Sequence, residues 1–161
     1  MKFAKYLMLL LLVVFSLCIE SKSENSLPGN TKPKEIVYVP AYSSIYHGNL
    51  VAELNLAITL SIHNIDAKNK ITIDSIDYYN TKGKMIHAYI KDNKIILEPM
   101  ETYNLGIKES DVRGGVGANF IVKWHAETNV NKPIVETVMI GTMGQQGISF
   151  TSRGTAIENY E

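Results

Sequence analysis

Histidine, cysteine and methionine are the residue types in this chain that could bind a metal ion. The four histidines are His47, His63, His87 and His125. No two of them have H-x-x-x-H or similar spacing, and none lies near a cysteine, although protein metal sites usually need such clusters. Met139 and Met143 would suit copper if they converged with His125. The spacing predicts solvated or hydrogen-bonded strand histidines, with no metal site and no cofactor.

A first glycine cluster, RGGVGANF, spans residues 113–120. A phosphate-binding loop would need its glycines to open a helix, whose N-terminal amides then face the anion. Here Phe120 stands where a dinucleotide fingerprint has its last glycine, and no Lys-Ser or Lys-Thr pair follows. The cluster therefore predicts a tight loop that leads into a strand.

A second cluster, GTMGQQG, spans residues 141–147 and is followed by ISFTSRG. Glycines spaced by three residues predict a mobile or sharply bent loop. The side chains of Gln145, Gln146 and Arg153 could bind a polar ligand or a peptide backbone. They could equally satisfy carbonyl groups of their own loop.

The stretch VYVPAYSSIYHG, residues 37–48, concentrates three tyrosines and a histidine. Tyrosine combines apolar area with a polar tip, so the stretch suits either a contact surface or a loop that covers one end of the fold. We expect these three segments to gather at one end and form a binding surface. Its candidate residues are Tyr42, Tyr46, His47, Arg113, Asn119, Gln145, Gln146 and Arg153.

We assign no catalytic residue from the sequence. No Gly-x-Ser-x-Gly nucleophile motif is present. Asp74 and Asp77 are close along the chain and could be neighbouring carboxylates, but exposed aspartates near a turn explain them as well.

The elements that must position these residues begin after an export segment. Lys2 and Lys5 precede a nearly continuous apolar run from Leu7 to Leu17, which is the layout of a secretory signal and too short for a membrane-spanning helix. Cys18, the only cysteine, could be lipidated, although Leu17 stands where a lipoprotein signal has a small residue. Cleavage after Ser23 is the alternative. Residues 1–23 are thus the predicted signal, and 24–35 a polar linker containing Pro28-Gly29 and Pro33.

Residues 36–161 follow the two-residue period of β-strands. Leucines and isoleucines at every second position from 54 to 62 alternate with mostly polar residues. The pattern slips between Ile73 and Ile76, which predicts a bulge, and a hairpin turn is expected around Gly83. Phe120, Val122 and Trp124 share one face and are core candidates. Further strands are expected at about 84–90, 94–97, 103–107, 118–126, 133–141 and 147–152.

Short strands separated by turns predict an all-β protein, a two-sheet immunoglobulin-like β-sandwich. No helical period extends over three turns after residue 36, and no fixed repeat is seen.

Charge excludes some partners. The chain has 16 basic and 16 acidic residues, and the part after residue 23 has a net charge of −2 without any basic stripe. Nucleic-acid binding is therefore not expected. Contact with a membrane is expected only through the N-terminal segment or a lipid on it.

Four motifs resemble an uncharacterised bacterial family of small exported, single-domain proteins that is known only as a domain of unknown function. They are VYVPAYSSIYHG, YYNTKGK, GGVGANFIVKW and MIGTMGQQGISFTSRG, and the resemblance covers residues 36–157. It implies a bacterial envelope protein, in the periplasm or anchored to a membrane, and brings no activity with it.

Three functions remain open at this stage. We favour a non-catalytic binding or structural module of the envelope, whose partner is an unknown envelope protein or a small polar ligand. A carbohydrate- or peptide-processing enzyme and a periplasmic metal-handling protein are the alternatives.

Overall fold

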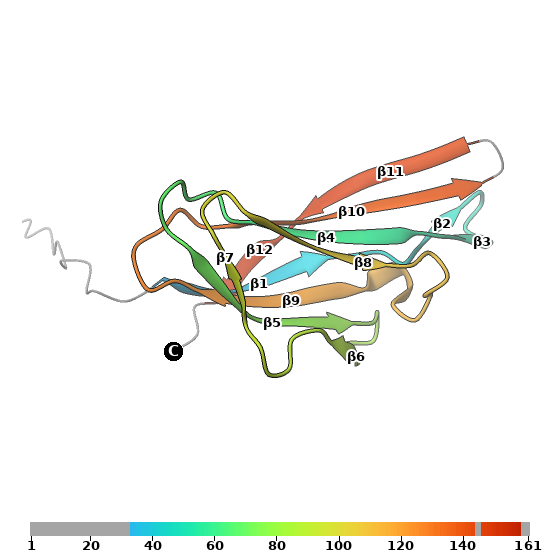
Figure 1. Cartoon of the computed structure of the whole chain (residues 1–161). Helices are drawn as coiled ribbons and strands as arrows, with labels where there is room; N and C mark the ends of the chain where they lie inside the picture. Colours follow the sequence, from blue (N-terminus) through green and yellow to red (C-terminus); the bar gives the residue numbers. More distant parts are fainter. Residues whose placement is uncertain (1–32, 144–145, 159–161) are drawn as a thin grey trace, which may run out of the picture. The chain divides into compact units, whose positions relative to one another are not determined.

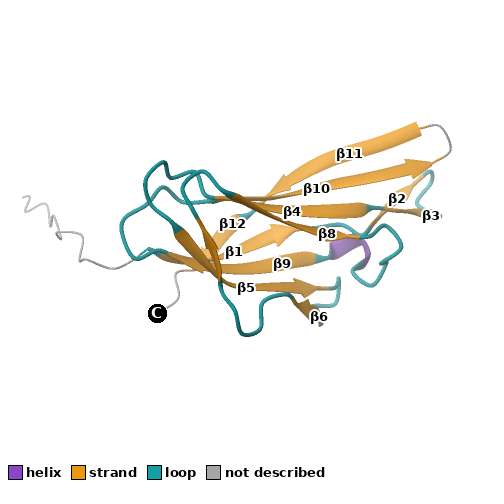
Figure 2. Cartoon of the chain, viewed as in Figure 1, coloured by secondary structure: helices purple, strands orange, loops and turns teal. Residues whose placement is uncertain are grey.

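The computed structural model describes residues 33–143 and 146–158. The predicted signal segment, Cys18, most of the predicted linker and Gln145 lie outside the described residues. The described chain forms twelve strands and one short 3-10 helix, η1, at Gly115–Gly117 (Figures 1 and 2). The strands are β1 Lys34–Pro40, β2 Ser44–His47, β3 Ala52–Asn55, β4 Ala57–His63, β5 Ile71–Tyr79, β6 Met85–Ala88, β7 Ile95–Leu97, β8 Thr102–Ile107, β9 Asn119–His125, β10 Ile134–Met143, β11 Gln146–Arg153 and β12 Thr155–Glu158.

The predicted two-sheet sandwich is confirmed. A six-stranded sheet has the order β12-β1-β9-β5-β6, with β7 also paired to β5, and a four-stranded sheet has the order β11-β10-β4-β8. Every strand pair is antiparallel. Along the chain, β1, β5 and β9 of the first sheet alternate with β4, β8 and β10 of the second, so the connections repeatedly cross between layers. The remaining pair, β2 and β3, forms a separate hairpin.

The core fills the space between the two sheets, as the alternating pattern predicts. Phe120, Val122 and Trp124 of β9 are all fully buried, and so are Leu60 and Leu56 from the segment opposite. Tyr78 stacks on Phe120 with ring centroids 4.8 Å apart. In β9 every second side chain is buried, so that one row of large apolar residues from this strand enters the core.

Two local irregularities in β5 also agree with the sequence. The pairing of β5 with β9 shifts register between Ile73 and Ser75, which is the predicted bulge. Gly83 has a φ of +72° in the turn between β5 and β6. Such a φ is readily adopted by glycine, which has no Cβ to clash.

The strand pair β11–β12 ties the two sheets together at one side. The chain leaves the four-stranded sheet after Arg153 and joins the six-stranded sheet at Thr155. Gly154 lies at this crossing, and its N–H donates to the Val135 carbonyl over 2.8 Å. A Cβ on Gly154 would lie 2.7 Å from Val37 Cγ1. The two sheets therefore approach closely here because the residue has no side chain.

Some boundaries differ from the prediction. The strands β2 and β12 were not expected, because neither segment shows a regular alternation of apolar and polar residues. The strand β1 begins at Lys34, inside the predicted linker, and Glu35 is buried beside Lys132 in an ion pair. The second glycine cluster was expected to be a bent loop, yet β10 extends to Met143 and β11 begins at Gln146.

The two ends of the sandwich carry different segments (Figure 1). The first and last described strands, β1 and β12, lie side by side at one end, since Ile36 pairs with Glu158. The opposite end, which we call the loop end, consists of residues 41–55, 80–84 and 108–118, together with the end of β10 at Met143 and the start of β11 at Gln146.

Buried polar side chains form hydrogen bonds between the loops at the end of the sandwich where the described chain begins and ends. The Asn64 amide donates to the carbonyls of Leu97 and Glu98 over 3.2 and 2.9 Å. The Asp66 carboxylate accepts the backbone N–H groups of Lys68, Asn69 and Asn131 over 2.9, 2.8 and 3.0 Å. Asp66 therefore connects its own loop to the loop before β10.

No helix among the described residues is long and apolar enough to cross a membrane.

Candidate binding surface at the loop end

Segments distant in the sequence meet at the loop end. The Ser43 N–H donates to the Gly115 carbonyl over 3.1 Å, and the Gly115 N–H donates to Ser43 Oγ over 2.7 Å. On the other side, the Tyr42 ring lies 5.7 Å from that of Phe150 in β11. The tyrosine-rich segment thus contacts both the first glycine cluster and the strand that follows the second. Two of the three segments expected to gather therefore touch directly, through Ser43 and Gly115.

Internal hydrogen bonds occupy two amides of the first glycine cluster, those of Gly115 and Gly117. Besides the Ser43 contact, Thr81 Oγ1 accepts the Gly117 N–H over 2.9 Å and donates to the Gly114 carbonyl over 3.0 Å. Because these amides already have hydroxyl partners, they do not form an anion cradle. The predicted tight loop leading into a strand is confirmed.

Gly114 is required by its close contact with Tyr78. A Cβ at Gly114 would lie 2.1 Å from the Tyr78 hydroxyl, which packs directly over this part of the backbone. Burial raises the pKa of Tyr78 to about 12, so the hydroxyl stays protonated at neutral pH. Tyr78 therefore shapes the floor of the loop end.

Asp111 holds Arg113 at the surface. Arg113 Nε and Nη2 donate to the two Asp111 carboxylate oxygens over 2.8 and 2.7 Å. This pair holds the pKa of the Asp111 carboxyl below its usual range. The Arg113 side chain is 62% exposed, and a guanidinium has five N–H donors. Arg113 is thus presented in a fixed orientation, with donors left over for a partner.

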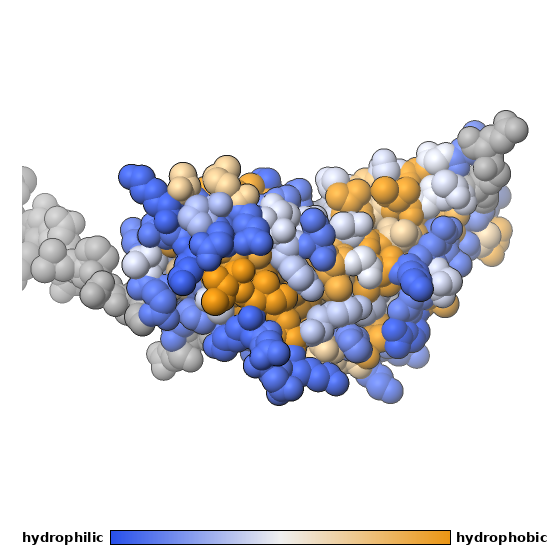
Figure 3. Space-filling view, viewed as in Figure 1, coloured by the Kyte–Doolittle hydropathy of each residue, from blue (hydrophilic) through white to orange (hydrophobic). Residues whose placement is uncertain are grey.

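The β2–β3 hairpin carries exposed side chains with apolar area, of which sequence reasoning singled out Tyr46 and missed Leu50 and Val51. Tyr46 is 53% exposed, Leu50 72% and Val51 87%. Leu50 has a φ of +61°, which is uncommon for a residue with a side chain. Hydrophobic atoms reach the surface over this hairpin (Figure 3). The Gly48-Asn49 pair signals the turn, but no pattern in the sequence shows that the next two residues lack a core to pack against.

The other predicted site residues are only partly brought together. His47 lies in β2, close to Tyr46, and Asn119 is half-buried at the start of β9 opposite Pro40. Gln146 is exposed at the start of β11. Arg153 lies at the far end of the same strand, opposite Glu136, and so outside the loop end. An eight-residue strand is about 26 Å long, which explains why proximity in sequence misleads here.

The histidines of the described sheets lie in separate surroundings. His63 Nδ1 lies 2.9 Å from Thr102 Oγ1, whereas His87 stacks edge-on against Tyr89. His125 Nδ1 lies 2.7 Å from Asp74 Oδ2, and Lys94 Nζ lies 2.5 Å from the other Asp74 oxygen. Asp74 is therefore a largely buried ion-pair partner, which corrects the expectation of an exposed aspartate. Within the described ranges, no group of three histidine, cysteine, aspartate or glutamate residues is placed to hold a metal ion.

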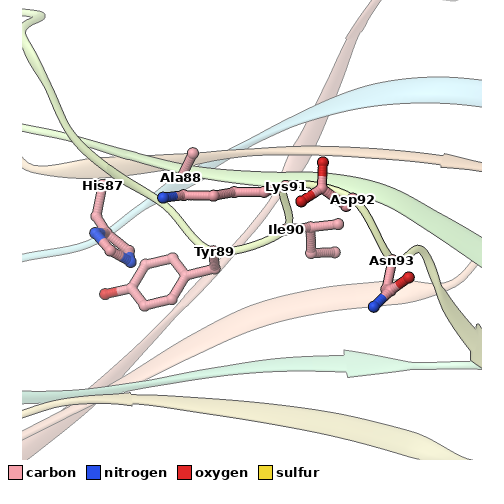
Figure 4. Close-up of a pocket in the computed structure, with 7 residues that line it drawn as sticks. All are labelled: His87, Ala88, Tyr89, Ile90, Lys91, Asp92 and Asn93. Carbon is pink, nitrogen blue, oxygen red and sulfur yellow. The ribbon is translucent and has the colours of Figure 1, made fainter.

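Two shallow hollows lie away from these loops. One, of about 370 Å³, is lined by the consecutive residues His87–Asn93 between β6 and β7. The His87 and Tyr89 rings lie together there, while Asn93 lies apart from them (Figure 4). The other, of about 380 Å³, includes Lys68, Glu98 and Glu127 at the end that holds the termini. A hollow lined by a single bend offers side chains from only one segment to a ligand.

Fold and surface together define a two-sheet β-sandwich with a composite loop surface at one end. Residues 34–157 match the family described as "Protein of unknown function (DUF3124)". The chain belongs to this family.

Two further comparisons complete the picture. No curated protein matches the chain. Among solved structures, it is similar to that titled "Crystal Structure of Thermotoga maritima 1070", with 11% identity and a TM-score of 0.46 over 78% of this chain and 97% of that chain.

Proposed function

We propose that the protein is a non-catalytic binding module of the bacterial cell envelope, exported by residues 1–23 and contacting an envelope protein through its loop end. One observation carries this proposal. Three segments from distant parts of the sequence are joined at the end of the sandwich opposite the described termini. Loops at one end of a rigid sandwich are a common location for binding sites.

The side chains of the loop end suit contact with a protein. Tyr46, Leu50 and Val51 protrude from the β2–β3 hairpin, and Arg113 is oriented by Asp111. Tyrosine and arginine are enriched among the residues that dominate binding energy at protein interfaces. Protruding apolar groups gain most when a partner removes them from water.

Two acids of this end, Tyr78 and Asp111, are suited to a structural role. The pKa of Tyr78 is about 12, and Arg113 stabilises Asp111 in its charged form. A general acid or base works best with a pKa near the operating pH. The acids Tyr78 and Asp111 therefore serve the framework of the surface better than a reaction.

Site-specific photocrosslinking in intact bacteria tests the proposal. A photoreactive phenylalanine analogue at Tyr46 should give covalent adducts with an envelope protein. The same analogue at Tyr38, an exposed tyrosine on the outer face of β1, is the matched control and should give none. Adducts at both positions, or at Tyr38 alone, would contradict a surface confined to the loop end.

A further inference from the structure

The strand β11 forms an open edge of the four-stranded sheet. It pairs with β10 over all eight residues without a register shift, and no other described strand pairs with it. The hydrogen bond from the Gly154 N–H to the Val135 carbonyl determines which residues of β11 turn their backbone N–H and C=O groups toward β10. In an antiparallel ladder, alternate residues turn their N–H and C=O groups to the other side. The free edge therefore presents the backbone groups of Gly147, Ser149, Thr151 and Arg153.

The other sheet edges are less suited to receive a strand. The edge strands β12 and β6 have four residues each, and their pairings contain irregularities. The strand β8 has six residues. Proteins usually protect edge strands by shortness, bulges, prolines or charges. Over its whole length, β11 has only the charge of Arg153 and contains no proline.

The two faces of β11 differ in chemistry. On the inner face, Ile148 is 41% exposed and Phe150 is half-buried against Tyr42. On the outer face, Ser149, Thr151 and Arg153 are exposed. A strand added beside β11 would therefore meet apolar side chains on one face and hydroxyls on the other.

We propose that β11 binds an extended peptide segment of the partner protein as an added β-strand. Backbone hydrogen bonds to the four outward-facing residues provide the pairing, and apolar side chains of the segment pack next to Ile148 and Phe150. The inference rests on the proposed binding function and names the class of partner. It also connects three predicted site residues. Gln146 and Arg153 belong to β11, and Tyr42 contacts Phe150 of the same strand, although Arg153 lies outside the loop end.

A second copy of this chain fits the edge less well. The contact is a strip about 26 Å long and one strand wide, which is far below the ~800 Å² per partner of a stable protein–protein interface. A short peptide, in contrast, needs only a ladder of backbone bonds and a few side-chain contacts.

The test uses random ten-residue peptides displayed on phage and selected against the full-length protein. Ser149→Pro removes an outward N–H and is compatible with an edge strand, while Ser149→Ala removes only the hydroxyl. Selected peptides should bind the wild type and Ser149→Ala equally, and Ser149→Pro at least tenfold more weakly. Bound peptide should also slow amide exchange at Gly147, Ser149, Thr151 and Arg153.

Several results would overturn the inference. They are failure to select any peptide, equal binding to Ser149→Pro, and exchange protection elsewhere on the domain. Concentration-dependent dimers of the wild type that Ser149→Pro abolishes would identify a second copy as the occupant. If Ser149→Pro does not fold, amide exchange on the wild type decides alone. Because crosslinking at Tyr46 is independent of these peptides, the proposed function can survive the loss of this inference.

Discussion

At the residue scale, single polar side chains accept the backbone N–H groups of the loops where strands end. Asp66 is 8% exposed and accepts three backbone N–H groups from two loops. These bonds lower its pKa from 3.8 to about 2. A buried carboxylate is tolerated here because each oxygen has donors.

Asp66 makes part of the stability of the fold depend on pH. Its folded-state pKa is depressed, so the stabilisation is present above pH 3.8 and is lost as the pH falls towards 2. We expect Asp66→Asn to lower the melting temperature at pH 7, because the amide nitrogen cannot accept one of the N–H groups. The difference from the wild type should shrink between pH 4 and pH 2. Circular dichroism melts across this range measure it.

Exposed Asp92 provides the control for this prediction. Asp92→Asn should leave the melting temperature at pH 7 unchanged, since the residue lies exposed between β6 and β7. If the difference in melting temperature between Asp66→Asn and the wild type stays constant from pH 7 to pH 2, the carboxylate charge does not contribute to the stability of the fold.

At the element scale, glycines mark the places where strands from different layers approach. Gly154 connects β11 to β12 and lies against Val37 and the Val135 carbonyl. Gly147, near the other end of β11, has nothing within 4 Å of its Cβ position. Substitution of glycine by alanine should therefore have different effects on stability at positions 154 and 147.

Gly154→Ala should destabilise the domain by about 1–3 kcal/mol, the usual cost of forcing extra atoms into a packed site. Gly147→Ala is the matched control and should be neutral or slightly stabilising, because alanine restricts the unfolded chain more than glycine does. Urea unfolding followed by Trp124 fluorescence measures both. Equal urea midpoints for the two variants would mean that the two sheets move apart at Gly154 to accept the methyl group without any loss of stability.

The long elements were predictable and the short ones only in part, since β6 and β7 were expected whereas β2 and β12 were not. In β4 and β9, side chains alternate so regularly that strand, phase and buried face follow from the sequence. For the second glycine cluster, strand propensity is low because glycine has no side chain to pack. The strand β10 nevertheless continues beyond its predicted end at Gly141 to Met143, and a Cβ on Gly141 would lie 2.6 Å from Leu56 Cδ2. Such a contact between distant residues has no local signal.

The candidate site was predictable only as a set of unusual segments. The chain composition of residues 37–48 and 113–120 indicated loops of special function, and their contact through Ser43 and Gly115 is confirmed. The side chains that protrude, Leu50 and Val51, were missed, since an apolar pair in sequence usually indicates core. Arg153 was grouped with the loops although its strand extends away from them.

At the scale of the whole chain, export is the prediction with the sharpest test. Residues 1–23 have the signal layout, so protein isolated from the envelope should lack the residues up to Leu17 or up to about Ser23. Intact-mass measurement of membrane and soluble envelope fractions distinguishes the two. A diacylglyceryl mass on Cys18, absent in Cys18→Ser, identifies lipidation. Full-length protein in the cytosol would contradict export.

The position of β1 has a mechanical consequence. The described chain begins at this strand, and β1 is an interior strand held by β12 on one side and by seven residue pairs with β9 on the other. A force on Lys34 directed away from the loop end acts along the strand axis, perpendicular to the ladder bonds. All of these bonds then bear the load in shear at once, instead of opening one after another as in a zipper. The domain is thus suited to resist tension applied between Lys34 and the loop end.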